Sequence, residues 1–300
     1  SPKIYFSKLN KKMDEEKKTP WSLILALMAI FFVVIIILFA LQPQPTTTAS
    51  ISGLSVKLFS NTTLKSNSYF TFNSTIFNTY DASLQNIRVW LEAGSLFSFS
   101  NSRLSNSTTL RIFNFLLPKG NISYIFSNIK VESISTEMKK IPIDLKILYF
   151  LQIDQPFTIN VVRNDSLQTY GGKENVGIFY KTPKVPISIS FNFDKNSFIY
   201  SKGKNEVAKF TILIKNSNAG KCIDNLKILM NANNNLSCKL LDKTLVGNFE
   251  TYQNFSEKLE IPCNYTLKYL DTKDFDSLPF KMQISCNYLE KKAFYFNILP

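Results

Sequence analysis

Histidine is absent from this chain of 300 residues. Histidine is the most common general base and a frequent zinc ligand, so its absence excludes Ser/His and Cys/His catalytic pairs and most zinc sites. The sequence contains neither a G-x-S-x-G nucleophile motif nor a Walker A phosphate loop. Residues 127–130 and 201–204 match S-x-x-K, but no K-T-G box accompanies them. We expect a protein that is not an enzyme and uses no cofactor or metal.

Arginine is also scarce. The formal net charge of +13 comes from 35 basic and 22 acidic residues, and the basic residues are mostly scattered lysines. Nucleic-acid-binding proteins favour arginine and cluster their charge on one face. We therefore expect no nucleic-acid partner. The arginines are Arg88, Arg103, Arg111 and Arg163.

Residues 21–41 lack charge altogether and predict a transmembrane helix. Such a helix rises about 31 Å, close to the roughly 30 Å hydrocarbon core of a bilayer. The alternative is a cleaved signal peptide, whose apolar region has only about 7 to 15 residues. Lysines enrich the tail at 1–20, whereas no basic residue follows the span until Lys57, so we expect a cytoplasmic N-terminus and an extracytoplasmic C-terminal region in the cell membrane.

Small residues in the predicted span and prolines after it suggest how the helix is used. Ser22, Ala26 and Ala29 are spaced by four and three residues, on one stripe. Small residues let transmembrane helices approach closely, so this stripe predicts packing against other membrane-protein subunits within the lipid bilayer. Residues 42–50, which begin QPQP, predict a short extended stalk because proline ends helices.

Beyond residue 50, short apolar runs bounded by Asn, Ser, Gly and Pro predict an all-β ectodomain. The first block, 51–163, predicts strands at 54–59, 69–77, 86–92, 110–117, 122–131, 141–151 and 157–162. The breaker-rich segment 164–186 predicts a linker. The second block, 187–300, predicts strands at 187–193, 206–214, 224–230, 237–241, 256–261, 280–287 and 293–298.

Two segments of these blocks are similar in character. Residues 68–91 (SYFTFNSTIFNTYDASLQNIRVWL) and 206–229 (EVAKFTILIKNSNAGKCIDNLKIL) each read as a long strand, an Asn-rich turn and a second strand. Together with Leu117-Pro118-Lys119-Gly120 before a later strand, they resemble the immunoglobulin-like modules of archaeal surface-layer-related membrane proteins. The resemblance implies two antiparallel β-sandwiches. Unlike the antibody pattern, Trp90 falls on the face opposite Ile87, Val89 and Leu91.

All four cysteines lie in the second block, on the side of the membrane where disulfides persist. A zinc site is the alternative, but no C-x-x-C or histidine supports it. In the immunoglobulin-like strand order, Cys222 begins strand C and Cys286 lies near the end of antiparallel strand F, so we expect these two to pair and Cys238 to pair with Cys263. An acidic loop at Asp271, Asp274 and Asp276 is either a Ca²⁺ site or a solvated loop beside lysines, and we favour the loop.

Eight N-x-[ST] acceptors occur, and all follow the predicted span. Such motifs also arise by chance in a chain rich in Asn and Ser. Turns expose a glycan best, whereas Asn73 falls in the middle of a predicted strand. The candidate N-glycosylation sites are Asn61, Asn73, Asn106, Asn121, Asn164, Asn235, Asn254 and Asn264.

These features together predict a non-catalytic, single-pass membrane glycoprotein. We expect an accessory or scaffolding subunit of a larger membrane complex, contacting other subunits through the helix and the first sandwich. A cell-surface adhesion or surface-layer anchoring protein is the main alternative, and an unusual enzyme or solute-binding protein is another.

Overall fold

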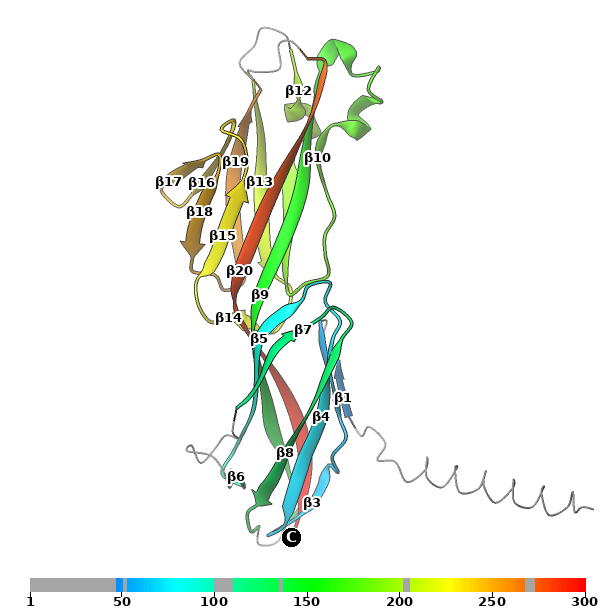
Figure 1. Ribbon diagram of the computed structural model, residues 1–300, viewed down its shortest axis with the longest axis vertical. Helices are drawn as coiled ribbons and strands as arrows, with labels where there is room; N and C mark the ends of the chain where they lie inside the picture. The colour runs from blue at the N-terminus through cyan, green and yellow to red at the C-terminus, as the bar shows by residue number, and fades with distance from the viewer. Residues whose placement is uncertain (1–46, 51–52, 100–109, 135–136, 202–205, 268–272) are drawn as a thin grey trace, which may run out of the picture. The chain divides into compact units, whose positions relative to one another are not determined.

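The computed structural model describes residues 47–50, 53–99, 110–134, 137–201, 206–267 and 273–300, all within one compact unit, Pro45–Pro300. This part of the chain is all-β and forms three sheets (Figure 1). Its only helices are short 3-10 turns: η1 (Asn164–Ser166), η2 (Gly172–Asn175) and η3 (Lys195–Phe198). Among these residues no helix has the length and hydrophobicity of a membrane span.

Two of the sheets have five strands each. The first has the order β1 (Thr47–Ser50), β2 (Leu54–Leu58), β4 (Tyr69–Asn78), β8 (Asn121–Val131) and β6 (Phe97–Phe99). The third has the order β11 (Ile187–Phe193), β13 (Val207–Asn216), β19 (Lys258–Thr266), β16 (Leu236–Leu240) and β17 (Lys243–Val246).

The second sheet has ten strands and packs against both of the other sheets. Its main order is β18 (Phe249–Gln253), β15 (Leu226–Asn231), β20 (Phe275–Leu299), β9 (Lys139–Arg163), β5 (Leu84–Ala93) and β7 (Arg111–Leu116). Four short strands join β9 or β20: β3 (Thr63–Lys65), β10 (Gly177–Tyr180), β12 (Ile199–Tyr200) and β14 (Lys221–Cys222). The β3–β20 and β12–β9 pairings are parallel, and the other described pairings are antiparallel.

Strands β9 and β20 are paired along almost their whole length, from Val162 opposite Phe275 to Lys139 opposite Ile298 (Figure 1). Every second residue of β9 from Ile143 to Val161 is buried, and so is every second residue of β20 from Phe280 to Ile298. An uninterrupted alternation keeps one side of a strand against a core over its full length. These two strands therefore form a single ribbon about 80 Å long at 3.3 Å per residue.

The ribbon provides strands to two successive sandwich-like pairs of packed sheets, the first and the second sandwich. In the first sandwich, Phe294 of β20 packs on Phe72 of the first sheet, with ring centroids 5.6 Å apart. In the second sandwich, Phe157 of β9 packs at 4.7 Å on Phe191 of the third sheet. Burying one such ring contributes about 1.5–3 kcal/mol. Residues 139–151 and 286–299 of the ribbon thus belong to the first sandwich, and the intervening residues 152–163 and 275–285 belong to the second.

This arrangement differs from the expected division of the chain. The expected strands 141–151 and 157–162 are one strand, and so are 280–287 and 293–298. The pairing of β20 with β9 also crosses the expected boundary between blocks 51–163 and 187–300. The expected linker 164–186 holds η1, η2 and β10, and β10 pairs with β9. Of the expected stalk 42–50, residues 47–50 form β1 and pair with β2.

Pro156 explains why β9 looks interrupted in the sequence, since it falls between the expected strands 141–151 and 157–162. Pro156 lies between the β9 residues that pair with β5 and those that pair with β10, so among the described strands only β20 pairs with β9 there. Pro142 lies beyond the last β5 pair, and Pro279 lies beyond the last β15 pair. Proline removes a ladder donor and is tolerated where one side of a strand has no partner. These prolines therefore do not end the strands.

The local patterns predict most of the longer remaining strands well, whereas the short strands β3, β6, β10, β12, β14, β17 and β18 were not expected. The expected 187–193 coincides with β11, and the expected 69–77 and 206–214 differ from β4 and β13 by at most two residues at either end. The expected faces of β5 are also confirmed. Ile87, Val89 and Leu91 are buried, while Trp90 is only half-buried and donates its Nε1–H to Glu92 at 2.8 Å.

Candidate functional site

A buried polar cluster lies on the ribbon where the first sandwich meets the second. Its centre is Glu290 of β20, whose side chain is 3% exposed. The hydroxyls of Tyr80 and Tyr149 both donate to Glu290 Oε1, at 2.8 and 2.6 Å. The amide of Asn218, from the second sandwich, donates to the Tyr80 hydroxyl. One carboxylate therefore organises groups from both sandwiches.

Lys292 is the cationic member of this cluster and is also enclosed. Its side chain is 0% exposed, and Nζ lies 3.4 Å from Glu290 Oε2. Within the described part of the chain, Nζ has no hydrogen-bond acceptor. An ammonium carries three donors and is costly to bury with a single counter-ion. The Lys292 ammonium therefore depends on Glu290 for most of its electrostatic compensation.

Burial dominates the acid–base properties of the cluster. It raises the pKa of Tyr80 and of Tyr149 well above the usual range, and the neighbouring charge of Glu290 raises both further. Burial lowers the pKa of Lys292, and Glu290 opposes that shift. Because desolvation disfavours each charged form, the two phenols stay neutral and available as donors.

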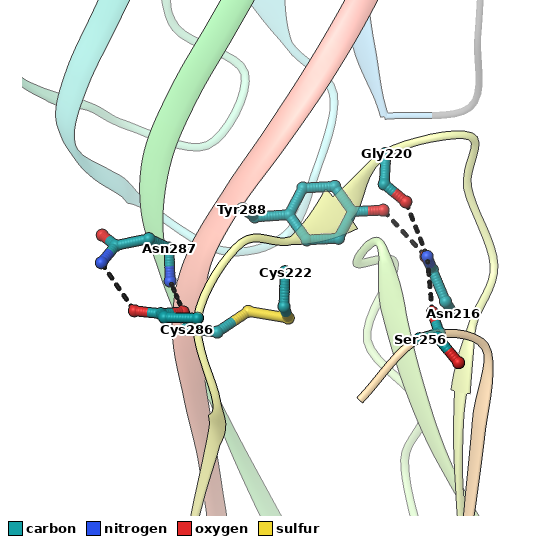
Figure 2. Close-up of a disulfide and its surroundings, with 8 residues drawn as sticks. Asn216, Gly220, Cys222, Ser256, Cys286, Asn287 and Tyr288 are labelled. Carbon is teal, nitrogen blue, oxygen red and sulfur yellow. Dashed lines mark hydrogen bonds between the residues drawn. A yellow bond between two sulfur atoms is a disulfide. The ribbon is translucent and has the colours of Figure 1, made fainter. Parts of the chain in front are cut away.

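A second group of contacts continues from the cluster to the Cys222–Cys286 disulfide (Figure 2). The Tyr288 hydroxyl donates to Asn216 Oδ1 at 2.8 Å, and Asn216 Nδ2 donates to the Gly220 carbonyl at 2.7 Å. A Cβ at Gly220 would lie 2.4 Å from the Tyr288 ring, so the turn approaches β20 closely only because Gly220 has no side chain. The disulfide then ties β14 to β20 beside this turn.

Asn216 has a counterpart in the first sandwich, at the aligned position of the similar segment. Asn78 ends β4 as Asn216 ends β13. Each amide donates to the carbonyl four residues later, of Ala82 or Gly220, and each amide oxygen accepts from the N–H two residues later. The similarity of 68–91 and 206–229 thus corresponds to one structure built twice: a strand, an asparagine-held turn and a strand in the facing sheet.

The chemistry of the cluster is that of a structural connection. Glu290 accepts hydrogen bonds from two phenols and lies beside one amine, and its side chain is only 3% exposed to solvent. A general base needs access to a substrate proton. The arrangement instead fixes the ribbon relative to the turns of both sandwiches.

Both expected disulfides are present. Cys222 pairs with Cys286, and Cys238 pairs with Cys263, so none of the four is free. Cys238 and Cys263 are direct cross-strand neighbours on β16 and β19, with Cα atoms 4.0 Å apart. Among the described residues no cluster of three or more Cys, Asp or Glu side chains is arranged to hold a metal ion.

The acidic loop is neutralised by basic side chains where it is described. Asp274 lies 2.5 Å from Arg163 Nη1, and Asp276 lies 3.3 Å from Lys273 Nζ. Asp271 lies outside the described residues. The two described carboxylates thus have lysine or arginine partners.

The candidate glycosylation sites differ in exposure. Asn73 in β4 is half-buried and lines a groove of about 720 Å³, and Asn235 is also half-buried. Asn106 lies outside the described residues. The exposed sites are Asn61, Asn121, Asn164, Asn254 and Asn264. The predicted tail 1–20, the span 21–41 and its residues Ser22, Ala26 and Ala29 also lie outside the described residues.

Glu290 and Lys292 were not identified from the sequence, although a signal exists. They occupy two successive buried positions in the alternation Phe280, Met282, Ile284, Cys286, Tyr288, Glu290, Lys292, Phe294, Phe296 and Ile298. Treating this stretch as two strands hid the alternation. Charged residues that occupy the buried positions of an alternating strand are expected to form ion pairs. Glu290 and Lys292 form such a pair with each other.

Comparisons with known proteins identify no family for this chain. No family model and no curated protein matches it. A solved structure, "pT26-6p", is 7% identical over 84% of this chain, with a TM-score of 0.23. The match covers 65% of that protein's own length, slightly less than two thirds. A TM-score this low does not establish a shared fold.

Proposed function

We propose that the protein is a non-catalytic, single-pass membrane glycoprotein whose tandem immunoglobulin-like ectodomain serves as an accessory or scaffolding subunit of a larger membrane complex. The observation that supports this most is the β9–β20 ribbon with its polar cluster. A linker of ordinary loop would let two sandwiches move independently. A ribbon hydrogen-bonded throughout keeps surfaces on both sandwiches in register, which a scaffolding subunit requires.

The strand orders support the immunoglobulin-like assignment of the sandwiches. In the first sandwich, β2-β4-β8-β6 faces β20-β9-β5-β7, the spatial order in which strands ABED face GFC, with an added edge strand beside C. In the second, β11-β13-β19-β16 faces β15-β20-β9. Strand β9 takes the F position in the first sandwich and the G position in the second, and β20 does the reverse. The second sandwich is therefore inserted between the last two strands of the first.

The proposed extracytoplasmic location is supported by the cysteines. Both disulfides are buried and restrict the unfolded chain: Cys238–Cys263 joins two strands of the second sandwich, and Cys222–Cys286 joins β14 to β20 where the sandwiches meet. Disulfides persist in oxidising compartments and are rare in the cytosol. The charge asymmetry around the apolar segment 21–41 points in the same direction, because lysines precede it and none follows until Lys57.

The first sandwich offers a surface for a neighbouring subunit. On β7, an edge strand of the described sheet, Ile112 is 64% exposed and Phe115 is 60% exposed. Leu110 and Leu117 flank the strand and are also exposed. Apolar side chains gathered on an edge strand favour association with another chain. We assign this β7 surface to the complex.

Recovery from native membranes in mild detergent tests the proposal. The full chain is expected to migrate within a larger complex on native gels, and Ile112→Ser/Phe115→Ser is expected to release it. The matched control is Val207→Ser/Val246→Ser, which changes two exposed valines of the second sandwich and leaves the complex intact. Migration of the unaltered protein as a lone monomer would refute the subunit role and favour surface adhesion.

The predicted span provides a separate test of the same proposal. Ala26→Leu/Ala29→Leu is expected to preserve membrane insertion while weakening the complex, because bulky side chains prevent close helix approach. Protease added to intact cells should remove everything beyond about residue 45 and spare the lysine-rich tail. Protection of the second sandwich would contradict the proposed orientation.

A further inference from the structure

A groove of about 870 Å³ lies beside the end of β18 in the second sandwich. Its lining includes the apolar side chains Leu240, Leu245 and Leu259 and the polar side chains Asn225 and Asp242. In the described contacts, neither polar side chain has a hydrogen bond or an ion pair. The groove thus combines apolar contact area with available polar groups, the combination that fixes small polar ligands.

One wall of this groove carries an aromatic ring beside a glycosylation acceptor. Tyr252 is 56% exposed, and Asn254 begins the acceptor Asn-Phe-Ser one residue beyond β18. The residues between and after them, Gln253 and Phe255, are half-buried and buried. In extended backbone, alternate residues share a side. Tyr252 and Asn254 therefore project together into solvent.

The ring of Tyr252 is already held in position. Its hydroxyl donates to Glu250 Oε1 at 2.7 Å, and Lys227 Nζ lies 5.7 Å from the ring centroid. Lys227 and Glu250 are themselves paired at 3.0 Å. A ring fixed before binding loses little conformational entropy when a ligand packs on it.

We propose that an N-glycan on Asn254 packs its first sugars against Tyr252 and lies in this groove. A pyranose ring presents an apolar C–H face that fits an aromatic ring, and its hydroxyls match the Asn225 amide and the Asp242 carboxylate. The covalent link keeps the sugar at an effective concentration in the millimolar range, so individually weak contacts suffice. This inference rests on the glycosylated surface location in the proposed function.

A double-mutant cycle on the full chain, expressed in an N-glycosylating host, tests the contact. The four proteins are the unaltered chain, Asn254→Gln, Tyr252→Thr and the combination. Asn254→Gln is expected to lower the Tm by about 1–4 °C, the range for one aromatic contact in a protein of this size. Tyr252→Thr also loses the Glu250 and Lys227 contacts, but it does so in both backgrounds, so that cost cancels in the cycle.

The cycle supports the inference if Tyr252→Thr costs less Tm without the glycan than with it. The control is Asn264→Gln, at an exposed acceptor on β19 that is absent from the groove lining, and its effect should add to that of Tyr252→Thr. Additive effects for Asn254, or peptide mass spectra with glycans on other acceptors but not on Asn254, would overturn the inference and leave the proposed function standing. Absence of glycan from every acceptor would overturn the inference together with the glycoprotein part of that function.

Discussion

Replacing Glu290 by glutamine tests the polar cluster most directly. The substitution keeps the size of the side chain and an oxygen that can accept from Tyr80 and Tyr149, but it removes the negative charge. Lys292 then keeps no counter-ion among the contacts described for it. Because neither side chain is more than 3% exposed, water cannot screen or replace the lost interaction.

The expected cost follows from these contacts. A hydrogen bond to a charged acceptor contributes about 1.5–3 kcal/mol, against about 0.5–1.5 kcal/mol for a neutral one. Two phenol hydrogen bonds therefore lose roughly 2 kcal/mol together. Removing one partner of a buried ion pair costs about 3–5 kcal/mol in total, which includes such losses. Glu290→Gln should lower the free energy of unfolding by about 3–5 kcal/mol.

Urea unfolding at neutral pH measures this cost, with Glu290→Gln/Lys292→Met as the compensated variant. Methionine keeps the apolar stem of Lys292 and removes the buried amine, so the double variant should regain at least about 2 kcal/mol. A cost below about 1 kcal/mol for the single variant, or no recovery in the double variant at an unchanged m-value, would refute the electrostatic account of the cluster.

Three further outcomes are expected. Stability should fall as pH rises above about 10, because burial raises the folded-state pKa of Tyr80 and Tyr149 and only the unfolded chain loses those protons there. Tyr149→Phe should make this slope shallower in urea midpoints measured from pH 8 to 11. Replacing the Cys222–Cys286 pair by alanines should cost about 4 kcal/mol in chain entropy, and replacing the Cys238–Cys263 pair about 3.5 kcal/mol, because these disulfides close loops of 64 and 25 residues. A larger loss of thermal stability for the Cys238–Cys263 replacement would contradict this. Asn78→Ala should cost about 2–4 kcal/mol in the same assay, because it removes the amide that donates to the Ala82 and Leu116 carbonyls and the oxygen that accepts from the Tyr80 N–H, whereas a cost under 0.5 kcal/mol would exclude that role.

The sequence predicts local structure better than connectivity here. Strands such as β4, β11 and β13 follow from alternation and from turn residues at their ends, which are local signals. The ribbon does not follow in the same way, because Pro156 in β9 and the charged residues 290–292 in β20 resemble breaks between strands. Whether a proline breaks a strand depends on a neighbour elsewhere in the chain, and that neighbour is not visible locally.

The candidate site shows the same limit. Disulfide pairing was predictable because strand order brings Cys222 to Cys286 and leaves Cys238 to Cys263. The Glu290 cluster was not predictable in this way. Its two phenols, Tyr149 of β9 and Tyr80 of the turn after β4, lie far from β20 in the sequence. Only the phase of the buried alternation identifies Glu290 in advance.

The exchange of strands between the sandwiches has a consequence for synthesis. Ile143 pairs with Phe294, although 151 positions separate them in the chain. A ribosome that has reached residue 151 has made all but the last major strand of the first sandwich, and it must then make the whole of the second sandwich before that strand emerges. Contacts of such long range form slowly. The unfinished sandwich exposes an open sheet edge and apolar core during this interval, the kind of surface that aggregates or recruits chaperones.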